Sequence, residues 1–262
     1  MACTRLNPFD GPVKIYVREI EEANEAPVSG STVTWTGWTD LGYRYQSDEG
    51  TTIEVSNTNE VVRPMGFTGG IMKLITAEDA TVSVALKKTD FAKISRYLIP
   101  GATYTEGATP TDPAITTLGG ARCLEPFELG IEGYDTTGGK LVAWFPRVTA
   151  SDSASLQFRK GDTEAPYSFA ALCDESADEG EQIFTMWAIP LTYTLTYTAG
   201  EGGTLTGTAT QTVVAGGDGT AVTAVADELY EFVAWSDGVL TAARTDENVT
   251  ANISATATFE LI

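Results

Sequence analysis

The chain has 262 residues and a formal net charge of −20, with 16 Lys and Arg residues against 36 Asp and Glu residues. Such acidity argues against a protein that holds nucleic acid through phosphate contacts, because that mode of binding needs a basic surface. The absence of histidine excludes Ser-His-Asp triads, Cys-His dyads and His-ligated zinc. A hydrophobic share of 42% and a charged share of 20% describe a folded chain that can form one large domain or two ordinary ones.

The cysteine pattern and the N-terminal residues indicate in which cellular compartment the chain is made. Cys3, Cys123 and Cys173 lie far apart and form no Cys-x-x-Cys motif, so neither a zinc ribbon nor a thioredoxin-like site is expected. We expect three reduced, buried thiols. The first residues lack the apolar segment of a signal peptide, and no run approaches the roughly 18 apolar residues of a membrane span. These features predict synthesis in a cytoplasm and no insertion into a membrane.

Alternation of apolar and polar residues dominates the first 190 residues and predicts an antiparallel β domain. In the first strand, Val13, Ile15 and Val17 alternate with polar or amphipathic neighbours. The strands expected on this basis cover residues 13–17, 53–55, 82–86, 127–131, 141–145, 156–159, 166–172 and 183–189.

One helix is expected, at about residues 90–99. Phe91, Ile94 and Leu98 fall on one helical face, whereas Lys93 and Arg96 point away from it. Thr89-Asp90 can cap the start and Pro100-Gly101 ends the helix.

Three polar segments are expected to be loops. Residues 43–70 form a long polar segment interrupted only by the short strand at 53–55, and a long loop of this kind is usually functional. Residues 101–120 are rich in Thr, Pro and Gly. Residues 174–181 are acidic, and although carboxylates on a loop can bind Ca²⁺, a solvated hairpin tip is the favoured interpretation.

The composition changes at Pro190. Residues 191–262 contain one basic residue, Arg244, and nine acidic residues, and they are dense in Thr, Ala, Val and Gly. Strict alternation at both ends of this region predicts a small immunoglobulin-like or grasp-like β module. We therefore expect two domains, at residues 1–190 and 191–262.

The sequence matches the patterns of known catalytic and ligand-binding sites only poorly. The sequence Gly138-Gly139-Lys140 lacks the first glycine and the Ser/Thr of a phosphate-binding loop. Two carboxylates could hydrolyse a glycoside, but the sequence selects no pair among the 36 acidic residues. The tryptophans could include sugar-stacking platforms, but on alternating strands they are expected mainly in the core; they are Trp35, Trp38, Trp144, Trp187 and Trp235. We expect no catalytic, cofactor-binding or metal-binding residues, and no enzyme.

The order of segments in residues 1–190 resembles the major tail tube proteins of long-tailed bacteriophages. The resemblance is carried by three segments: WTDLGYRYQSDEGTTIEV at 38–55, the strands and short helix at 66–102, and the closing strands with "FPR" and "KGD" at 139–175. The C-terminal region is similar to divergent internalin-type B repeats, through Gly202-Gly203, the stretch YEFVAWSDG at 230–238, Arg244 and Asn248. Tail tube proteins often carry such an extra domain on the outside of the tube.

The tail tube resemblance implies a β-sandwich or barrel with a flanking helix and no cofactor. It further implies hexameric rings of this chain stacked into a hollow tube in the virion, with the tape measure, tail terminator and distal tail proteins as further partners. DNA would pass through the acidic lumen without specific binding. Residues 43–70 would be the inter-ring contact loop, with contacts at Asp48, Glu49, Glu54, Glu60, Arg63 and Phe67, and the helix would contribute Lys93 and Arg96.

The C-terminal region by itself favours a different class, which is a bacterial surface or carbohydrate-binding protein with a B-repeat-like module. The missing signal peptide counts against that class.

Overall fold

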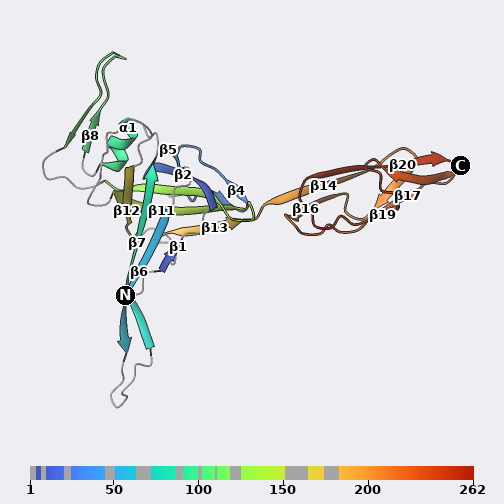
Figure 1. Cartoon of the computed structure of the whole chain (residues 1–262), viewed down its shortest axis with the longest axis horizontal. Helices are drawn as coiled ribbons and strands as arrows, with labels where there is room; N and C mark the ends of the chain where they lie inside the picture. The colour runs from blue at the N-terminus through green and yellow to red at the C-terminus, as the bar shows by residue number, and fades with distance from the viewer. Residues whose placement is uncertain are drawn as a thin grey trace. The chain divides into compact units, whose positions relative to one another are not determined.

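The computed structural model describes residues 4–6, 10–20, 25–44, 51–62, 72–86, 91–99, 102–109, 111–118, 125–150, 165–173 and 183–262. The fold is mainly β, with antiparallel sheets and very little helix (Figure 1), as the sequence predicts. The chain forms two compact units. Unit 1 comprises residues 1–136 and 140–189, and unit 2 comprises residues 137–139 and 190–262.

Unit 1 is built around a nine-stranded sheet, in which β13 (Thr185–Ile189) pairs with β11 beside the main path. The main path runs in the order β1 (Thr4–Leu6), β6 (Thr52–Val62), β7 (Met72–Leu86), β12 (Ala165–Ala171), β11 (Lys140–Ala150), β10 (Phe127–Tyr134), β2 (Asp10–Glu19) and β5 (Thr39–Arg44). All pairs are antiparallel, so the parallel pairing that needs long crossovers does not occur among these strands.

The hydrophobic core of unit 1 lies on one face of this sheet. Val13, Ile15 and Val17 of β2 are buried on that face, which confirms the alternation predicted for the first strand. The same core contains Ile53 of β6 and Leu41 of β5, although these strands lie near opposite ends of the strand order. The sheet therefore curves around its core, as sandwich and barrel folds do.

The helical segment at residues 91–98 is where the sequence predicts it. It consists of one α turn, α1 (Phe91–Lys93), followed by a π-helical turn, η1 (Ile94–Leu98). Leu98 is buried in the unit 1 core, and the hydroxyl of buried Ser95 shares a hydrogen bond with Thr116. Such a short segment is stabilised by tertiary contacts rather than by helix propensity.

Two loop predictions are wrong. Within the predicted loop 43–70, residues 52–62 form one continuous strand, β6, which pairs with β7 along its whole length. Within the predicted loop 101–120, β8 (Ala102–Thr105) and β9 (Ile115–Leu118) pair as a separate hairpin. Both segments are rich in threonine and β-branched residues, whose strand preference outweighs their low hydrophobicity once a partner strand is available.

One further prediction is corrected, and several others concern residues that the structure does not describe. Cys173 is exposed, contrary to the expectation of a buried thiol, because it follows the end of β12 where the chain leaves the sheet. Cys3 and Cys123, the strand predicted at 156–159 and the acidic tip at 174–181 lie outside the described residues.

A further small hairpin, β3 (Val28–Ser29) with β4 (Thr32–Val33), precedes Trp35 and Trp38. The turn contains Gly30, whose φ of 62° lies in the left-handed region that glycine tolerates best.

Unit 2 is a two-sheet β module. Its first sheet has the order β16 (Thr210–Val214), β14 (Thr192–Ala199), β20 (Ile253–Leu261) and β18 (Tyr230–Trp235). Its second sheet has the order β15 (Gly203–Thr206), β17 (Val222–Ala226) and β19 (Ala243–Arg244). The first and last strands of the module, β14 and β20, pair in parallel, whereas the other pairs are antiparallel.

The core of unit 2 is separate from that of unit 1 and joins both sheets of the module. Leu195, Ala255 and Ala257 come from the first sheet, and Val222 and Ala224 come from the second. This is the Ig-like arrangement predicted for the C-terminal region. The boundary predicted after residue 190 remains a prediction about independent folding.

Candidate functional site

A long β-hairpin extends beyond the body of unit 1. Residues 56–62 of β6 pair with residues 72–79 of β7, with a register shift after Thr58. In the described part of the chain, neighbouring strands reach only the proximal half of this hairpin: β1 pairs with residues 53–55, and β12 pairs with residues 81–86. Figure 1 shows the two strands leaving the sheet together as a two-stranded ribbon. We call residues 56–62 and 72–79 the hairpin arm.

The predicted inter-ring residues fall partly on this hairpin. Glu54 is exposed on β6 near the body, and Glu60 lies in the hairpin arm rather than in a loop. Asp48, Glu49, Arg63 and Phe67 lie outside the described residues. The expected loop is thus a strand over residues 52–62, and a role of this segment in contacts between rings stays a prediction.

The two basic residues of the helical segment are placed differently. Lys93 is half-buried and donates a hydrogen bond to the backbone carbonyl of Asp40, so it is engaged within its own unit. Arg96 is exposed, with its guanidinium 5.4 Å from the centre of the Tyr104 ring. Lys93 is thus tied to the backbone of β5, whereas Arg96 lies over an aromatic ring of β8.

The sheet face opposite the core carries a buried ion pair. Arg18 of β2 and Glu128 of β10 occupy paired positions, and the guanidinium donates to both carboxylate oxygens, with Nη2 to Oε1 at 2.9 Å. Glu128 is fully buried and also accepts a hydrogen bond of 3.3 Å from the indole of Trp144. The Arg18 guanidinium lies 4.6 Å from the ring centre of Trp38. The charge of Glu128 is thus neutralised and saturated with donors, as burial of a carboxylate requires.

A second carboxylate on the same face is held by a tryptophan. The indole of Trp35 donates a 2.6 Å hydrogen bond to Glu132, and Lys140 lies 3.4 Å from the same carboxylate. Trp35 also stacks on Tyr16 with ring centres 4.2 Å apart. Burial, followed by the nearby charge of Glu132, raises the pKa of Tyr16 to about 12. We call this set the aromatic–carboxylate cluster; it consists of Tyr16, Arg18, Trp35, Trp38, Glu128, Glu132 and Trp144.

Gly130 allows this cluster to close on the sheet. It lies between Glu128 and Glu132 on β10, and a Cβ atom there would overlap the Trp35 ring. A glycine inside a strand often marks such a close approach.

The two carboxylates of the cluster each have partners within it or beside it. Glu128 is paired with Arg18, whereas Glu132 accepts a hydrogen bond from the Trp35 indole and lies near Lys140. The cluster holds the segment that follows the β3–β4 hairpin against the sheet.

The core of unit 2 contains its own buried charge network. Arg244, the only base of the module, is 7% exposed and donates to Asp246 (Nη2 to Oδ1, 2.6 Å) and to Asp237 (Nη1 to Oδ1, 3.0 Å). The Tyr197 hydroxyl donates a 2.5 Å hydrogen bond to Asp246. The guanidinium also lies 5.2 Å from the ring centre of Trp235. The arrangement links β14, β18 and β19 with the loop after β19.

The network fixes the ionisation of its members. Burial alone would raise the pKa of Asp246, but the hydrogen bonds from Arg244 and Tyr197 outweigh it and lower that pKa. Burial and the hydrogen bond to Asp246 raise the pKa of Tyr197. Sequence reasoning singled out Arg244 as the lone base of the region but not its partners.

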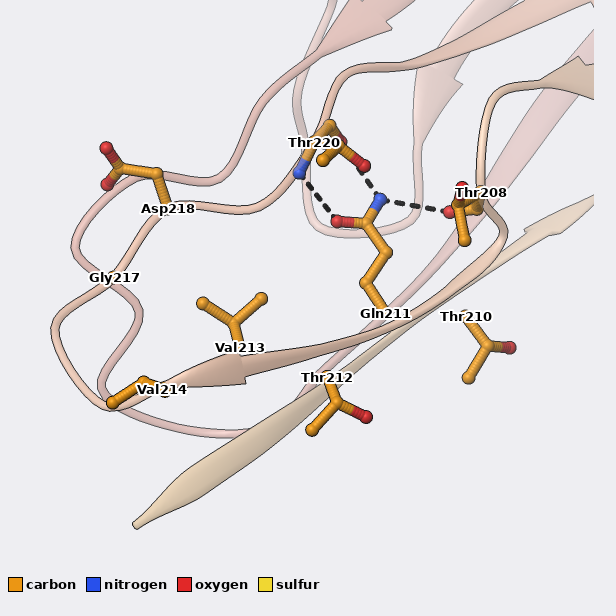
Figure 2. Close-up of a pocket in the computed structure, with 9 residues that line it drawn as sticks. All are labelled: Thr208, Thr210, Gln211, Thr212, Val213, Val214, Gly217, Asp218 and Thr220. Carbon is orange, nitrogen blue, oxygen red and sulfur yellow. Dashed lines mark hydrogen bonds between the residues drawn. The ribbon is translucent and has the colours of Figure 1, made fainter. Parts of the chain in front are cut away.

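An open depression of about 520 Å³ lies along β16. Figure 2 shows its lining, which consists of Thr208, Thr210, Gln211, Thr212, Val213, Val214, Gly217, Asp218 and Thr220. The Gln211 side chain is hydrogen-bonded to backbone groups of both Thr208 and Thr220. The lining is neutral except for Asp218.

The described residues hold no group of three or more acidic or cysteine side chains placed to bind a metal ion. Among them, no helix is both long and apolar enough to cross a bilayer.

Comparison with known protein families gives a match for most of unit 2. Residues 193–262 match the divergent InlB B-repeat domain family, in agreement with the resemblance of the C-terminal region and with its two-sheet fold. The comparison with curated proteins gives no match.

Proposed function

We propose that this chain is a structural virion protein, the major tail tube subunit of a long-tailed bacteriophage. In this proposal unit 1 forms stacked hexameric rings, and unit 2 is a B-repeat module on the outside of the tube. The observation that carries the proposal is the hairpin arm. The tape measure, tail terminator and distal tail proteins are the further partners expected of such a subunit.

The hairpin arm has the properties of a segment that contacts another subunit. A two-stranded ribbon without a third strand is marginally stable by itself. In the arm, residues 56–62 and 72–79 pair only with each other among the described residues. Its backbone edges can accept further strands, and native proteins normally cover or protect such edges. An adjoining ring would supply the missing cover.

The outer strands of the sheet fit the same proposal. Among the described strands, β1 and β5 each have a neighbour on one side only. Joining these edges between subunits of a ring would remove them from solvent and make a continuous inner wall. With a net charge of −20, such a wall would repel phosphate groups, so DNA could pass without binding.

Shortening the hairpin arm tests the proposal. Residues 58–77 are replaced by Asn-Gly, which forms a two-residue turn between Asn57 and Glu78, a paired position. The core residues Ile53, Ala80 and Val82 remain in place. We expect the full-length chain to form rings or tubes at high concentration in negative-stain electron microscopy, and the variant to remain a folded single subunit.

A matched control shortens the other projecting hairpin. Residues 106–114 are replaced by Asn-Gly between Thr105 and Ile115, the last pair of β8 and β9. This control should still form tubes. Normal tubes from the shortened arm, or a permanently monomeric full-length chain, would refute the tail tube assignment.

The family match of unit 2 favours a second candidate. A B-repeat module on a mainly β chain would also suit a bacterial surface or carbohydrate-binding protein. That candidate expects the purified chain to bind bacterial cells or a polysaccharide, and it expects the binding to be lost without residues 190–262. Tube formation without such binding would support the tail tube proposal against the second candidate.

A further inference from the structure

The outer edge of β16 is an open hydrogen-bonding edge. The Ala215 amide donates to the Leu191 carbonyl, and the Tyr197 amide donates to the Ala209 carbonyl, both at 2.8 Å. Because bonding alternates along an antiparallel ladder, the odd-numbered residues of β16 face β14. The backbone groups of Thr210 and Thr212 and the amide of Val214 therefore face outward, whereas the Val214 carbonyl already accepts a 2.8 Å hydrogen bond from the Gly217 amide. Residues 190–262 are all described, and no strand of the module pairs on that side.

This edge lacks the features that normally protect an edge strand. Residues 202–217 contain no charged side chain, in a chain with a net charge of −20. β16 also contains no proline, and its pairing with β14 has no bulge. The opposite edge of the same sheet, β18, carries exposed Glu231 and a register shift between Phe232 and Ala234. Protection by charge and bulging is thus present at one edge and missing at the other.

The open edge is also held rigid. Gln211 is 8% exposed, and its Nε2 donates to the carbonyls of Thr208 and Thr220, each at 2.9 Å. Its Oε1 accepts a 2.7 Å hydrogen bond from the Thr220 amide. These bonds fasten β16 to the segment that forms the wall of the depression in Figure 2. An incoming strand would therefore meet an ordered template, which lowers the entropic cost of binding.

We infer that the β16 edge pairs with the β16 edge of a second copy of this chain, antiparallel and across a two-fold axis. The outward-facing residues fix the register: Thr212 pairs with Thr212, and Thr210 pairs with Val214. The Thr212 pair exchanges two backbone hydrogen bonds, and in each Thr210–Val214 pair the Val214 amide donates to the Thr210 carbonyl. The β-branched side chains on the solvent face contact one another across the strands. The two four-stranded sheets become one continuous sheet of eight.

A second copy is the occupant that the charge distribution favours. Two copies that each carry a charge of −20 repel one another at most surfaces. Residues 202–217 offer a contact surface without charges. A strand that can pair with an antiparallel copy of itself suits a two-fold interface, in which the same surface is used by both copies. A single strand pair buries far less than the roughly 1,200 Å² of a stable interface. The pairing is therefore weak between free molecules and becomes effective where copies are held close together.

Cysteine trapping tests this pairing in the full-length chain. In a hydrogen-bonded antiparallel pair the Cα atoms lie about 5.5 Å apart, which suits a disulfide. With diamide as the oxidant, Thr212→Cys should form a disulfide that joins position 212 of the two copies, identified by mass spectrometry and thereby distinguished from links through the native cysteines. The matched control is Thr198→Cys, which is exposed but lies on β14 between β16 and β20. We expect at least tenfold faster cross-linking at position 212.

Two further measurements fix the register and separate this inference from the tail tube proposal. A mixture of Thr210→Cys and Val214→Cys chains should give the mixed 210–214 disulfide in preference to a 210–210 or a 214–214 disulfide. Introducing Thr212→Pro into both chains removes an outward amide and should suppress the mixed disulfide. The same pattern is expected in the shortened hairpin variant, in which no tubes form. Equal rates at 212 and 198, or symmetric 210–210 links in excess, would overturn the inference.

Discussion

Replacing Arg244 by Met removes the charge at the centre of the unit 2 network while keeping most of the side-chain volume. The variant leaves Asp246 with a side chain 17% exposed and without its strongest partner. Breaking a buried ion pair costs about 3–5 kcal/mol. Asp237 is 37% exposed and can regain water, so we expect the lower end, about 3 kcal/mol, with the lost contact to Trp235 included.

That loss is large for a module of this size. At about 0.05–0.15 kcal/mol per residue, a domain of roughly 70 residues has a free energy of unfolding near 4–10 kcal/mol. A loss of about 3 kcal/mol lowers the Tm of such a domain by roughly 12–24 °C. The measurement is thermal unfolding of the full-length chain, with hydrogen exchange at Ala224 and Val249 as the local probe of the unit 2 core.

A second variant distinguishes the electrostatic reason from simple loss of packing. Arg244→Met combined with Asp246→Asn removes the Arg244 charge and that of its more buried partner, so only the more exposed Asp237 carboxylate loses its partner. We expect the double variant to be more stable than Arg244→Met alone. A single variant that loses less than about 1 kcal/mol, which is the range of an exposed pair, or a double variant that is less stable than the single one, would refute the reasoning.

Three further outcomes are expected. Gly130→Ala should destabilise unit 1 by about 1–3 kcal/mol, as overpacking does, because its Cβ meets the Trp35 ring; in a Trp35→Ala background the loss in chemical unfolding should shrink, and an unchanged loss would contradict this cause. Since the pKa of Asp246 is lowered in the folded state, its contribution to stability is present above the usual pKa of about 4 and is lost as the pH falls below it; acid titration of unit 2 unfolding should show this loss, and an Asp246→Asn chain should lack it. If unit 1 alone forms the tube wall, a chain ending at Ile189 should still give tubes, with a thinner outer profile in electron microscopy; loss of all assembly by a folded truncation would place unit 2 in the wall.

The strand pattern of the core could be predicted from the sequence because burial on one face imposes a period of two. Val13, Ile15 and Val17 show this pattern and are buried as expected. The short helical segment and the Ig-like C-terminal module were predicted for similar local reasons. The central residue of the unit 2 network, Arg244, was visible only as a lone base among nine acidic residues.

The pairings between segments far apart in the chain were decided only by the tertiary structure. Residues 56–62 are too polar to show a buried face in the sequence, yet they continue β6 because β7 supplies a complete ladder of backbone partners. Likewise, no local pattern connects Arg18 with Glu128, which are 110 positions apart, or Trp35 with Glu132. Backbone hydrogen bonding and the pairing of buried charges depend on which strands become neighbours, and strand order is a property of the folded chain rather than of any local segment.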